Sequence, residues 1–163
     1  MRRPTPLHGP RVAGFTLVEL MIAIVVLAVL AAVAFPSYLN ALRKGRRSEA
    51  VAALSAVQQG QERWRANNQQ YTTSLTDLNS GMPASGAVTG PGGYYALSIE
   101  QAGATGYVLA AQAVAGTSQA GDTGCQTMRL QLFNGAIFYG GCNACSTPAA
   151  GAQVSDPNRC WSK

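Results

Sequence analysis

Four cysteines have the clearest potential chemistry in this chain, and all lie in its last quarter: Cys125, Cys142, Cys145 and Cys160. An even number of cysteines in a loop-rich segment predicts disulfides, which form outside the cytoplasm. The alternatives are reduced thiols or a zinc site, because the spacing of Cys142 and Cys145 is typical of metal ligands. His8 is the only histidine and no second pair has this spacing, so we expect no metal site and no cofactor. A redox motif would need a strand–helix context that this segment lacks.

Glu19 is the second residue of interest, because it is a carboxylate inside an apolar block. Residues 15–35 read FTLVELMIAIVVLAVLAAVAF, interrupted only by Thr16 and Glu19. As a helix this block would be about 32 Å long, which matches a hydrocarbon core of about 30 Å. It is apolar on all sides, so we expect a transmembrane helix over residues 15–35. A carboxylate in lipid is costly and usually has a function.

Two general interpretations of this block are possible. In a secretory signal peptide, the basic start would fit and Ala32-Val33-Ala34 would be the cleavage site. The apolar stretch is longer than the core of such a peptide, however, and it contains a carboxylate. A plain membrane anchor would leave Glu19 without a function.

The segment around the start of the block supports a third interpretation. Residues 14–20 read GFTLVEL and follow a basic leader. This combination resembles the processing site of type IV prepilins and of the related pseudopilins. The resemblance implies a leader of residues 1–14, cleavage between Gly14 and Phe15, and N-methylation of Phe15 by a prepilin peptidase/methylase. It also implies that Glu19 pairs with the amine of a neighbouring subunit, which offsets the cost of burying both charges.

The helix is predicted to continue beyond the membrane, over residues 15–67 in total. Pro36 follows the apolar block and predicts a helix kink. Beyond it, mostly small residues recur at spacings of three and four and form one stripe that suits packing against a sheet. The stripe consists of Ala50, Ala53, Leu54, Val57, Gly60 and Trp64. The bases at residues 43–47 are interpreted as a solvated face, or alternatively as contacts with lipid headgroups or other subunits.

Residues 68–163 are predicted to form a globular head. After a loop over residues 67–93, four alternating or apolar segments predict strands at residues 94–100, 107–113, 128–133 and 136–139. Asn134-Gly135 between the last two is a favoured hairpin turn. The fold class is therefore α+β: a long N-terminal helix, its first half transmembrane, packed on a four-stranded antiparallel sheet with a disulfide-closed C-terminal loop. This architecture is similar to the type IV pilin fold, and QERWRANNQQYTTSLTDL at residues 61–78 resembles the same stretch of PilE-like minor pilins.

The resemblance also bears on the cysteine pairing. Pilins usually close the C-terminal loop by a disulfide from the sheet to the tail, which implies Cys125–Cys160 and leaves Cys142–Cys145 as a small internal bridge. Four cysteines allow three pairings, and the sequence alone leaves all three open.

The expected function is structural. The sequence contains no paired-carboxylate motif, no nucleophile with a nearby histidine and no phosphate-binding loop, so we expect no enzyme. The resemblance implies a minor subunit of a type IV pilus that supports pilus assembly, adhesion or twitching motility. Its expected partners are other pilin subunits, the prepilin peptidase/methylase and the inner membrane before assembly. We expect a single-pass protein with a cytoplasmic N-terminus, which becomes part of an extracellular pilus.

Two other functions stay open. A competence pilin would bind DNA for uptake, and phosphate binding needs basic groups. The formal net charge is +5, but residues 66–163 carry three bases against four acids, so DNA is a possible partner that the charge pattern does not favour. A pseudopilin of a type II secretion system would share the processing site.

Overall fold

The computed structural model describes residues 14–78, 93–143 and 145–161. Contacts within the chain divide it into two compact units, one ending at Leu39 and one beginning at Asn40. The predicted leader lies outside the described residues except for Gly14, as does most of the second half of the predicted 67–93 loop.

One helix, α1 (Leu17–Arg65), spans both units and carries Pro36 in its interior. In the first unit, the described side chains from residue 14 to residue 38 are all exposed. Within the described residues, α1 is the helix that is long and apolar enough to cross a membrane. Arg63 and Arg65 lie in its last turn, where positive charge is favourable next to the helix carbonyls.

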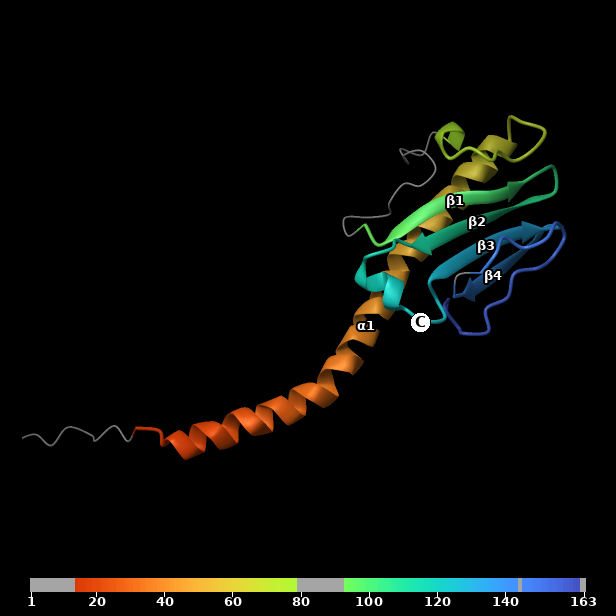
Figure 1. The fold of residues 1–163 in the computed structure, drawn as a ribbon. Coiled ribbons are helices and arrows are strands. Elements are labelled where there is room, and N and C mark those ends of the chain that lie inside the picture. The colour runs from red at the N-terminus through yellow and green to blue at the C-terminus, as the bar shows by residue number, and fades with distance from the viewer. Residues whose placement is uncertain (1–13, 79–92, 144, 162–163) are drawn as a thin grey trace, which may run out of the picture. The chain divides into compact units, whose positions relative to one another are not determined.

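The second unit contains a four-stranded antiparallel sheet with strand order β1-β2-β3-β4 (Figure 1). The strands are β1 (Tyr95–Ala102), β2 (Gly106–Ala113), β3 (Thr127–Phe133) and β4 (Ala136–Cys142). All four predicted strands are present, and β4 extends three residues beyond the predicted 136–139. The β3–β4 connection is the predicted two-residue turn: Asn134 and Gly135 have φ values of 49° and 80°, as a type I′ turn requires.

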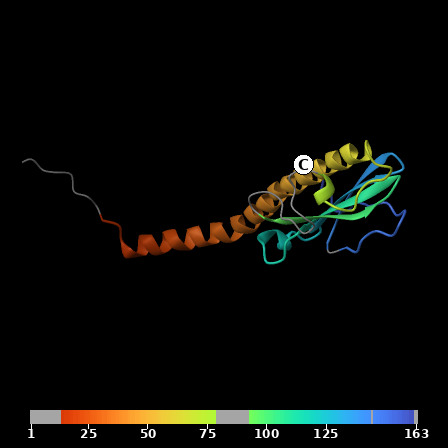
Figure 2. The ribbon, with the colours of Figure 1, turned by 90° about the horizontal axis from the view of Figure 1, so that it is seen from above.

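The second half of α1 runs along one face of this sheet (Figure 2). Ala50, Leu54, Val57 and Gly60 of the predicted stripe are buried there, while Ala53 and Trp64 are partly buried. The sheet supplies alternate residues to the same core, as the period of a strand requires; they are Tyr95, Leu97, Tyr107, Leu109, Ala111, Met128 and Leu130. The fold is therefore the predicted α+β arrangement, with the Cys125–Cys160 disulfide closing its C-terminal region.

The connection that follows α1 is tied to the helix by a residue that the stripe did not predict. Gln61 is fully buried. Its amide nitrogen donates to the Thr72 carbonyl at 2.7 Å, and its amide oxygen accepts from the Thr72 backbone N–H at 3.1 Å. Both polar ends are satisfied, which removes the cost of burying this side chain. Gly60 allows the 3₁₀ turn η1 (Thr76–Leu78) to approach, because a Cβ atom at residue 60 would lie 3.1 Å from the Leu78 Cβ.

Candidate functional site

The first candidate site is the segment at the start of α1. Gly14 and Phe15 precede the helix and are exposed. The Thr16 hydroxyl accepts a hydrogen bond from the Glu19 backbone N–H at 3.3 Å. Thr16 therefore acts as the N-cap, and Glu19 lies in the first turn, where negative charge is favourable near the helix N-terminus. The sequence-based prediction missed this cap, although a Thr followed three residues later by Glu is its usual signal.

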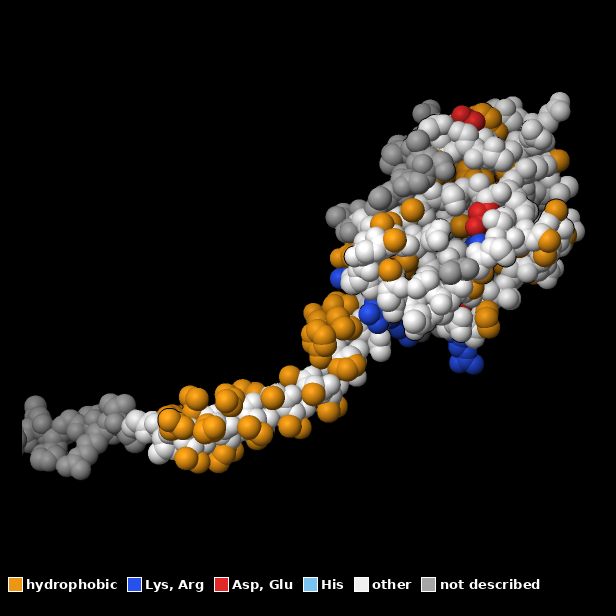
Figure 3. All heavy atoms as spheres, viewed as in Figure 1, with side chains coloured by type: hydrophobic (Ala, Val, Ile, Leu, Met, Phe, Trp, Pro, Cys, Tyr) orange, Lys and Arg blue, Asp and Glu red, His pale blue; other side chains and the backbone are white. Residues whose placement is uncertain are grey.

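A long and largely apolar surface covers this part of the helix. Large hydrophobic side chains from Phe15 to Tyr38 are at least half exposed, and Figure 3 shows them along this part of α1. Exposed apolar patches of this extent mark membrane or protein contact sites. The first unit is thus built to lie in lipid or against other apolar helices.

The bases near the start of the second unit make contacts that the sequence did not predict. Arg43 Nε donates to the Ser118 carbonyl at 3.2 Å, and an Arg46 guanidinium nitrogen donates to the Ser118 hydroxyl. The Arg46 guanidinium also lies 4.0 Å from the centroid of the Tyr94 ring. The interpretation of residues 43–47 as a solvated helix face is therefore wrong for most of its bases; Lys44 is exposed.

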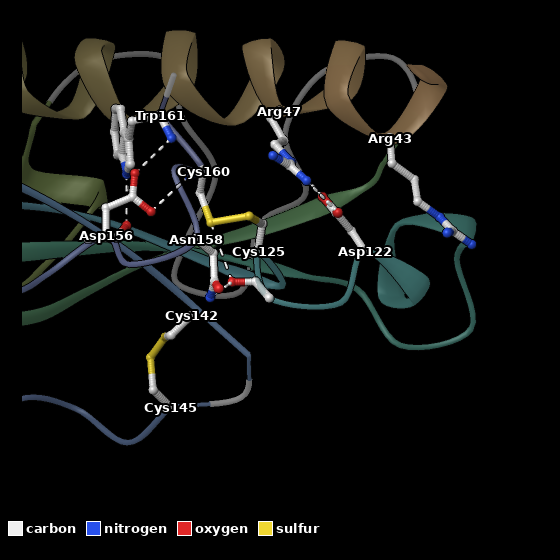
Figure 4. Close-up of a disulfide and its surroundings, with 12 residues drawn as sticks. Arg43, Arg47, Asp122, Cys125, Cys142, Cys145, Asp156, Asn158, Cys160 and Trp161 are labelled. Carbon is white, nitrogen blue, oxygen red and sulfur yellow. Dashed lines mark hydrogen bonds and ion pairs between the residues drawn. A yellow bond between two sulfur atoms is a disulfide. The ribbon is translucent and has the colours of Figure 1, made fainter. Parts of the chain in front are cut away.

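The ion pair among these contacts joins Arg47 to Asp122. The two side chains form a bidentate ion pair with N–O distances of 2.7 and 2.6 Å, in which Asp122 retains 6% of its side-chain exposure (Figure 4). The hydrogen bond with Asp122 raises the pKa of Arg47. Asp122 follows the 3₁₀ turn η2 (Ser118–Gly121), so the ion pair fixes the β2–β3 connection to α1.

A buried polar cluster continues from this ion pair into the core. The Gln119 amide nitrogen donates to Asp122 Oδ2 and to the Tyr95 hydroxyl oxygen, both at 2.8 Å. Tyr95 is fully buried. Burial, together with the nearby Asp122 carboxylate, raises the pKa of Tyr95 to about 12. Tyr95 is therefore held as a neutral phenol.

Stability should fall at alkaline pH because of this tyrosine. An unfolded tyrosine loses its proton near pH 10, whereas folded Tyr95 keeps it to about pH 12. Between these two pH values, the free energy of unfolding therefore falls by about 1.4 kcal/mol for each pH unit. We expect Tyr95→Phe to flatten the fall in the free energy of unfolding between pH 10 and 12, measured by chemical unfolding. Tyr139→Phe, at a residue that is 48% exposed, is the matched control and should leave the slope unchanged.

The far end of α1 carries a cluster of aromatic side chains. The Tyr71 and Tyr107 rings pack edge to face with centroids 4.8 Å apart, and the Tyr107 hydroxyl donates to Glu62 at 3.2 Å. Burial raises the pKa of both tyrosines. A hollow of about 580 Å³ beside Tyr71 is lined mainly by Trp64, amide side chains and hydroxyl side chains. Through Glu62 and Tyr71, the QERWRANNQQYTTSLTDL stretch packs against Tyr107 of β2.

The C-terminal tail is attached by the disulfide that closes it and by polar contacts. Cys125 is joined to Cys160, and both residues are buried in the core (Figure 4). The Asp156 carboxylate accepts the backbone N–H groups of Cys160 and Trp161 at 2.8 and 3.0 Å. Trp161 Nε1 donates to the Gly140 carbonyl on β4 at 2.7 Å. The structure also pairs Cys142 with Cys145, farther from α1 (Figure 4).

Comparison with known proteins connects these two units to one family. Residues 9–35 match the family model described as "Prokaryotic N-terminal methylation motif". Residues 36–129, more than half of the chain, match the model described as "Type IV minor pilin ComP, DNA uptake sequence receptor". The first match ends where the second begins, so together they cover the apolar helix and most of the head.

Two curated relatives are similar over shorter segments. The chain is 35% identical over 70 residues to the "Type IV major pilin protein PilA" of Myxococcus xanthus, which is 43% of this chain and 32% of the relative. It is 29% identical over 70 residues to the "Type II secretion system core protein G" of Aeromonas hydrophila, which is 43% of this chain and 49% of the relative. The chain thus covers at most about half the length of either relative. The family match is the broader finding, and it agrees with the fold: the chain belongs to the family of type IV minor pilins.

Proposed function

We propose that this chain is a minor subunit of a type IV pilus that supports pilus assembly, adhesion or twitching motility, and that it acts as a structural protein and not as an enzyme. The observation that carries the proposal is the match of residues 36–129 to a minor pilin family directly behind a methylation motif. The exposed apolar part of α1 supports it, because a helix of this kind needs lipid or other apolar helices around it.

Processing at the start of α1 belongs to the same proposal. A prepilin peptidase/methylase cleaves between Gly14 and Phe15 and methylates Phe15, and both residues lie exposed ahead of the helix. Before assembly the chain spans the inner membrane once over residues 15–35, with its N-terminus in the cytoplasm and residues 68–163 outside. After assembly it lies in an extracellular filament beside other pilin subunits.

Mass spectrometry of filaments sheared from the native cells tests the proposal. The expected result is a peptide that begins at methylated Phe15, in small proportion to another pilin. Filaments that lack the chain, together with a cell-bound protein that begins at Phe35, would support a secretory signal peptide instead. A chain that is processed correctly at Phe15 but is absent from the filaments would support a pseudopilin, which the similarity to the type II secretion protein favours.

Replacing Glu19 tests how the subunit enters the filament. We expect Glu19→Ala to be cleaved normally. Its amount in sheared filaments should be at least about tenfold below that of the natural chain. The reason is that the amine of a neighbouring Phe15 would be buried without a partner. Quantitative mass spectrometry of filament and membrane fractions measures both steps.

Thr16→Ala is the matched control for Glu19→Ala. It removes the hydroxyl that caps α1, which costs about 1 kcal/mol of helix stability, but it leaves the carboxylate in place. The control should therefore be incorporated nearly normally. Equal loss in the two variants would mean that Glu19 acts through the helix start, and normal incorporation of Glu19→Ala would exclude charge pairing.

The matching family model is described as a DNA uptake sequence receptor, and on this ground we propose DNA binding and uptake as a second function. Residues 43–47 carry four bases on one short stretch of α1, of which Lys44 is exposed. Mobility shift of duplex DNA at 50 and 200 mM salt tests this function. A complex whose affinity falls steeply with salt supports this function, since each phosphate contact makes the slope of log K against log salt more negative by about 0.9. Unchanged mobility at low salt would remove it. Lys44→Gln should make this slope less steep by about one unit.

A further inference from the structure

The two cysteine pairs lie in contrasting environments. Cys125 and Cys160 are each 2% exposed, inside the core between α1 and the sheet. Cys142 and Cys145 are only partly buried, and they line a hollow of about 190 Å³ together with the tail. A reagent from solvent can therefore reach the second pair without opening the core.

A buried cation lies beside the accessible pair. Arg129 projects from the face of the sheet opposite the core, and its side chain is 6% exposed. One of its guanidinium nitrogens donates to the Cys145 sulfur and lies 3.5 Å from the Cys142 sulfur. The other terminal nitrogen donates to the Cys145 carbonyl at 3.0 Å. Arginine is always protonated in proteins, so both sulfurs face a permanent positive charge.

The position of this cation is fixed by Glu100. The Glu100 carboxylate accepts two hydrogen bonds from Arg129, both at 2.8 Å, so the guanidinium has little freedom. Among the described residues, Arg129 from β3 and Glu100 from β1 are the charged side chains at this pair. Arg129 contacts the sulfurs directly, whereas Glu100 acts through Arg129 and offsets part of its charge.

We propose that Cys142–Cys145 is a thiol–disulfide exchange site for dithiols, in which Arg129 stabilises the Cys145 thiolate. A thiolate of the dithiol attacks the Cys142 sulfur, a new S–S bond forms there, and the bond to Cys145 breaks. Cys145 leaves as a thiolate beside the guanidinium, because the better-stabilised thiolate leaves faster. The second thiol of the dithiol then displaces Cys142. The dithiol is oxidised to a disulfide, the pair is reduced to a thiol and a thiolate, and the remaining proton goes to solvent.

The surrounding contacts allow this exchange without unfolding. Gln131 on β3 donates to the Ala152 carbonyl and accepts from the Val154 backbone N–H, both at 2.9 Å. Gln101 on β1 donates to the Pro148 carbonyl. The sheet therefore holds the tail beyond Cys145 whether or not the small ring is closed. The helix that activates a thioredoxin-type pair is absent from this segment of the described chain, and Arg129 supplies the positive charge in its place.

Dithiothreitol titration of the full chain in detergent micelles tests the site, with alkylation and mass spectrometry as the readout. We expect Cys142 and Cys145 to be alkylated at dithiol concentrations at least about tenfold lower than those that expose the buried pair. Cys125–Cys160 is the internal control, and the far-ultraviolet circular dichroism should not change at the first step. Reduction of both pairs at one concentration would overturn the proposal.

The role of Arg129 has its own readout, the pH at which the alkylation rate of reduced Cys145 is half-maximal. This midpoint should lie below about 8.5, the ordinary value of a free cysteine. In Glu100→Gln it should fall further, because the opposing charge is gone. In the double variant Glu100→Gln, Arg129→Gln, which leaves no unpaired buried charge, it should rise to about 8.5. A midpoint that is the same in all three proteins would exclude Arg129 as the stabilising group, even if each variant folds.

Discussion

Asp122→Ala is expected to lower the free energy of unfolding by about 3–5 kcal/mol, the usual cost of breaking a buried ion pair from one side. The Asp122 carboxylate accepts two hydrogen bonds from Arg47 and one from Gln119. The variant leaves the Arg47 guanidinium, whose side chain is 17% exposed, without its partner. Chemical unfolding of the full chain in detergent micelles, followed by tryptophan fluorescence, measures the loss.

Asp77→Ala is the matched control for this variant. Asp77 is exposed and accepts one hydrogen bond, from the Thr72 hydroxyl at 2.9 Å. Its loss should cost about 1 kcal/mol. Replacing both partners, Arg47→Met with Asp122→Leu, should recover most of the stability, because no buried charge then remains without a partner. If Asp122→Ala costs no more than Asp77→Ala, the ion pair does not hold the β2–β3 connection to α1.

The parts of the fold that the sequence predicted are those that local patterns determine. The stripe on α1 has a period near 3.6 and the strands have a period of two, and each period is set by neighbouring residues. The Asn134-Gly135 turn has the same local origin. The end of β4 gave no such signal, because Gly140 and Gly141 have no side chains to alternate. A Cβ atom at residue 141 would overlap the Cys160 sulfur, so this glycine is required by a contact that only the fold creates.

The polar contacts of the head were not predictable for a related reason. Arg47 and Asp122 are 75 residues apart in sequence, and Arg129 and Glu100 are 29 apart. Their proximity depends on strand order and register, whereas a run of bases in a sequence is the same whether its side chains are solvated or paired. The count of bases and acids in the sequence therefore gave no indication of which bases are free to bind a ligand.

At the start of α1, the sequence was more informative than the structure of one chain. The segment from Gly14 to Glu19 was identified from residue types alone, since it is a linear motif, and residues 9–35 match the model of an N-terminal methylation motif. The structure adds the Thr16 cap to this segment. Whether Glu19 pairs with a neighbouring Phe15 depends on a second subunit, so filament composition and not the fold of one chain is the relevant measurement.

Removing the Cys125–Cys160 disulfide should have the second large effect. The bridge closes a loop with a sequence separation of 35, which restricts the unfolded chain by about 3–4 kcal/mol. We expect the double variant Cys125→Ala, Cys160→Ala to lose about this much free energy of unfolding in the same chemical unfolding experiment. The tail should stay attached to the sheet, because Trp161 donates to the Gly140 carbonyl on β4 and Gln131 on β3 binds the Ala152 and Val154 backbone, and none of these hydrogen bonds involves sulfur.

Cys142→Ala with Cys145→Ala is the matched control, since it removes the other bridge from the same region. That bridge has a sequence separation of only 3, so the loop-closure contribution should be about 2 kcal/mol smaller. A difference of this size between the two double variants would assign structural closure of the head to Cys125–Cys160. Equal losses would mean that stability depends on the local packing of each bridge. The accessible pair would then be structural as well, which conflicts with reversible exchange at Cys142 and Cys145.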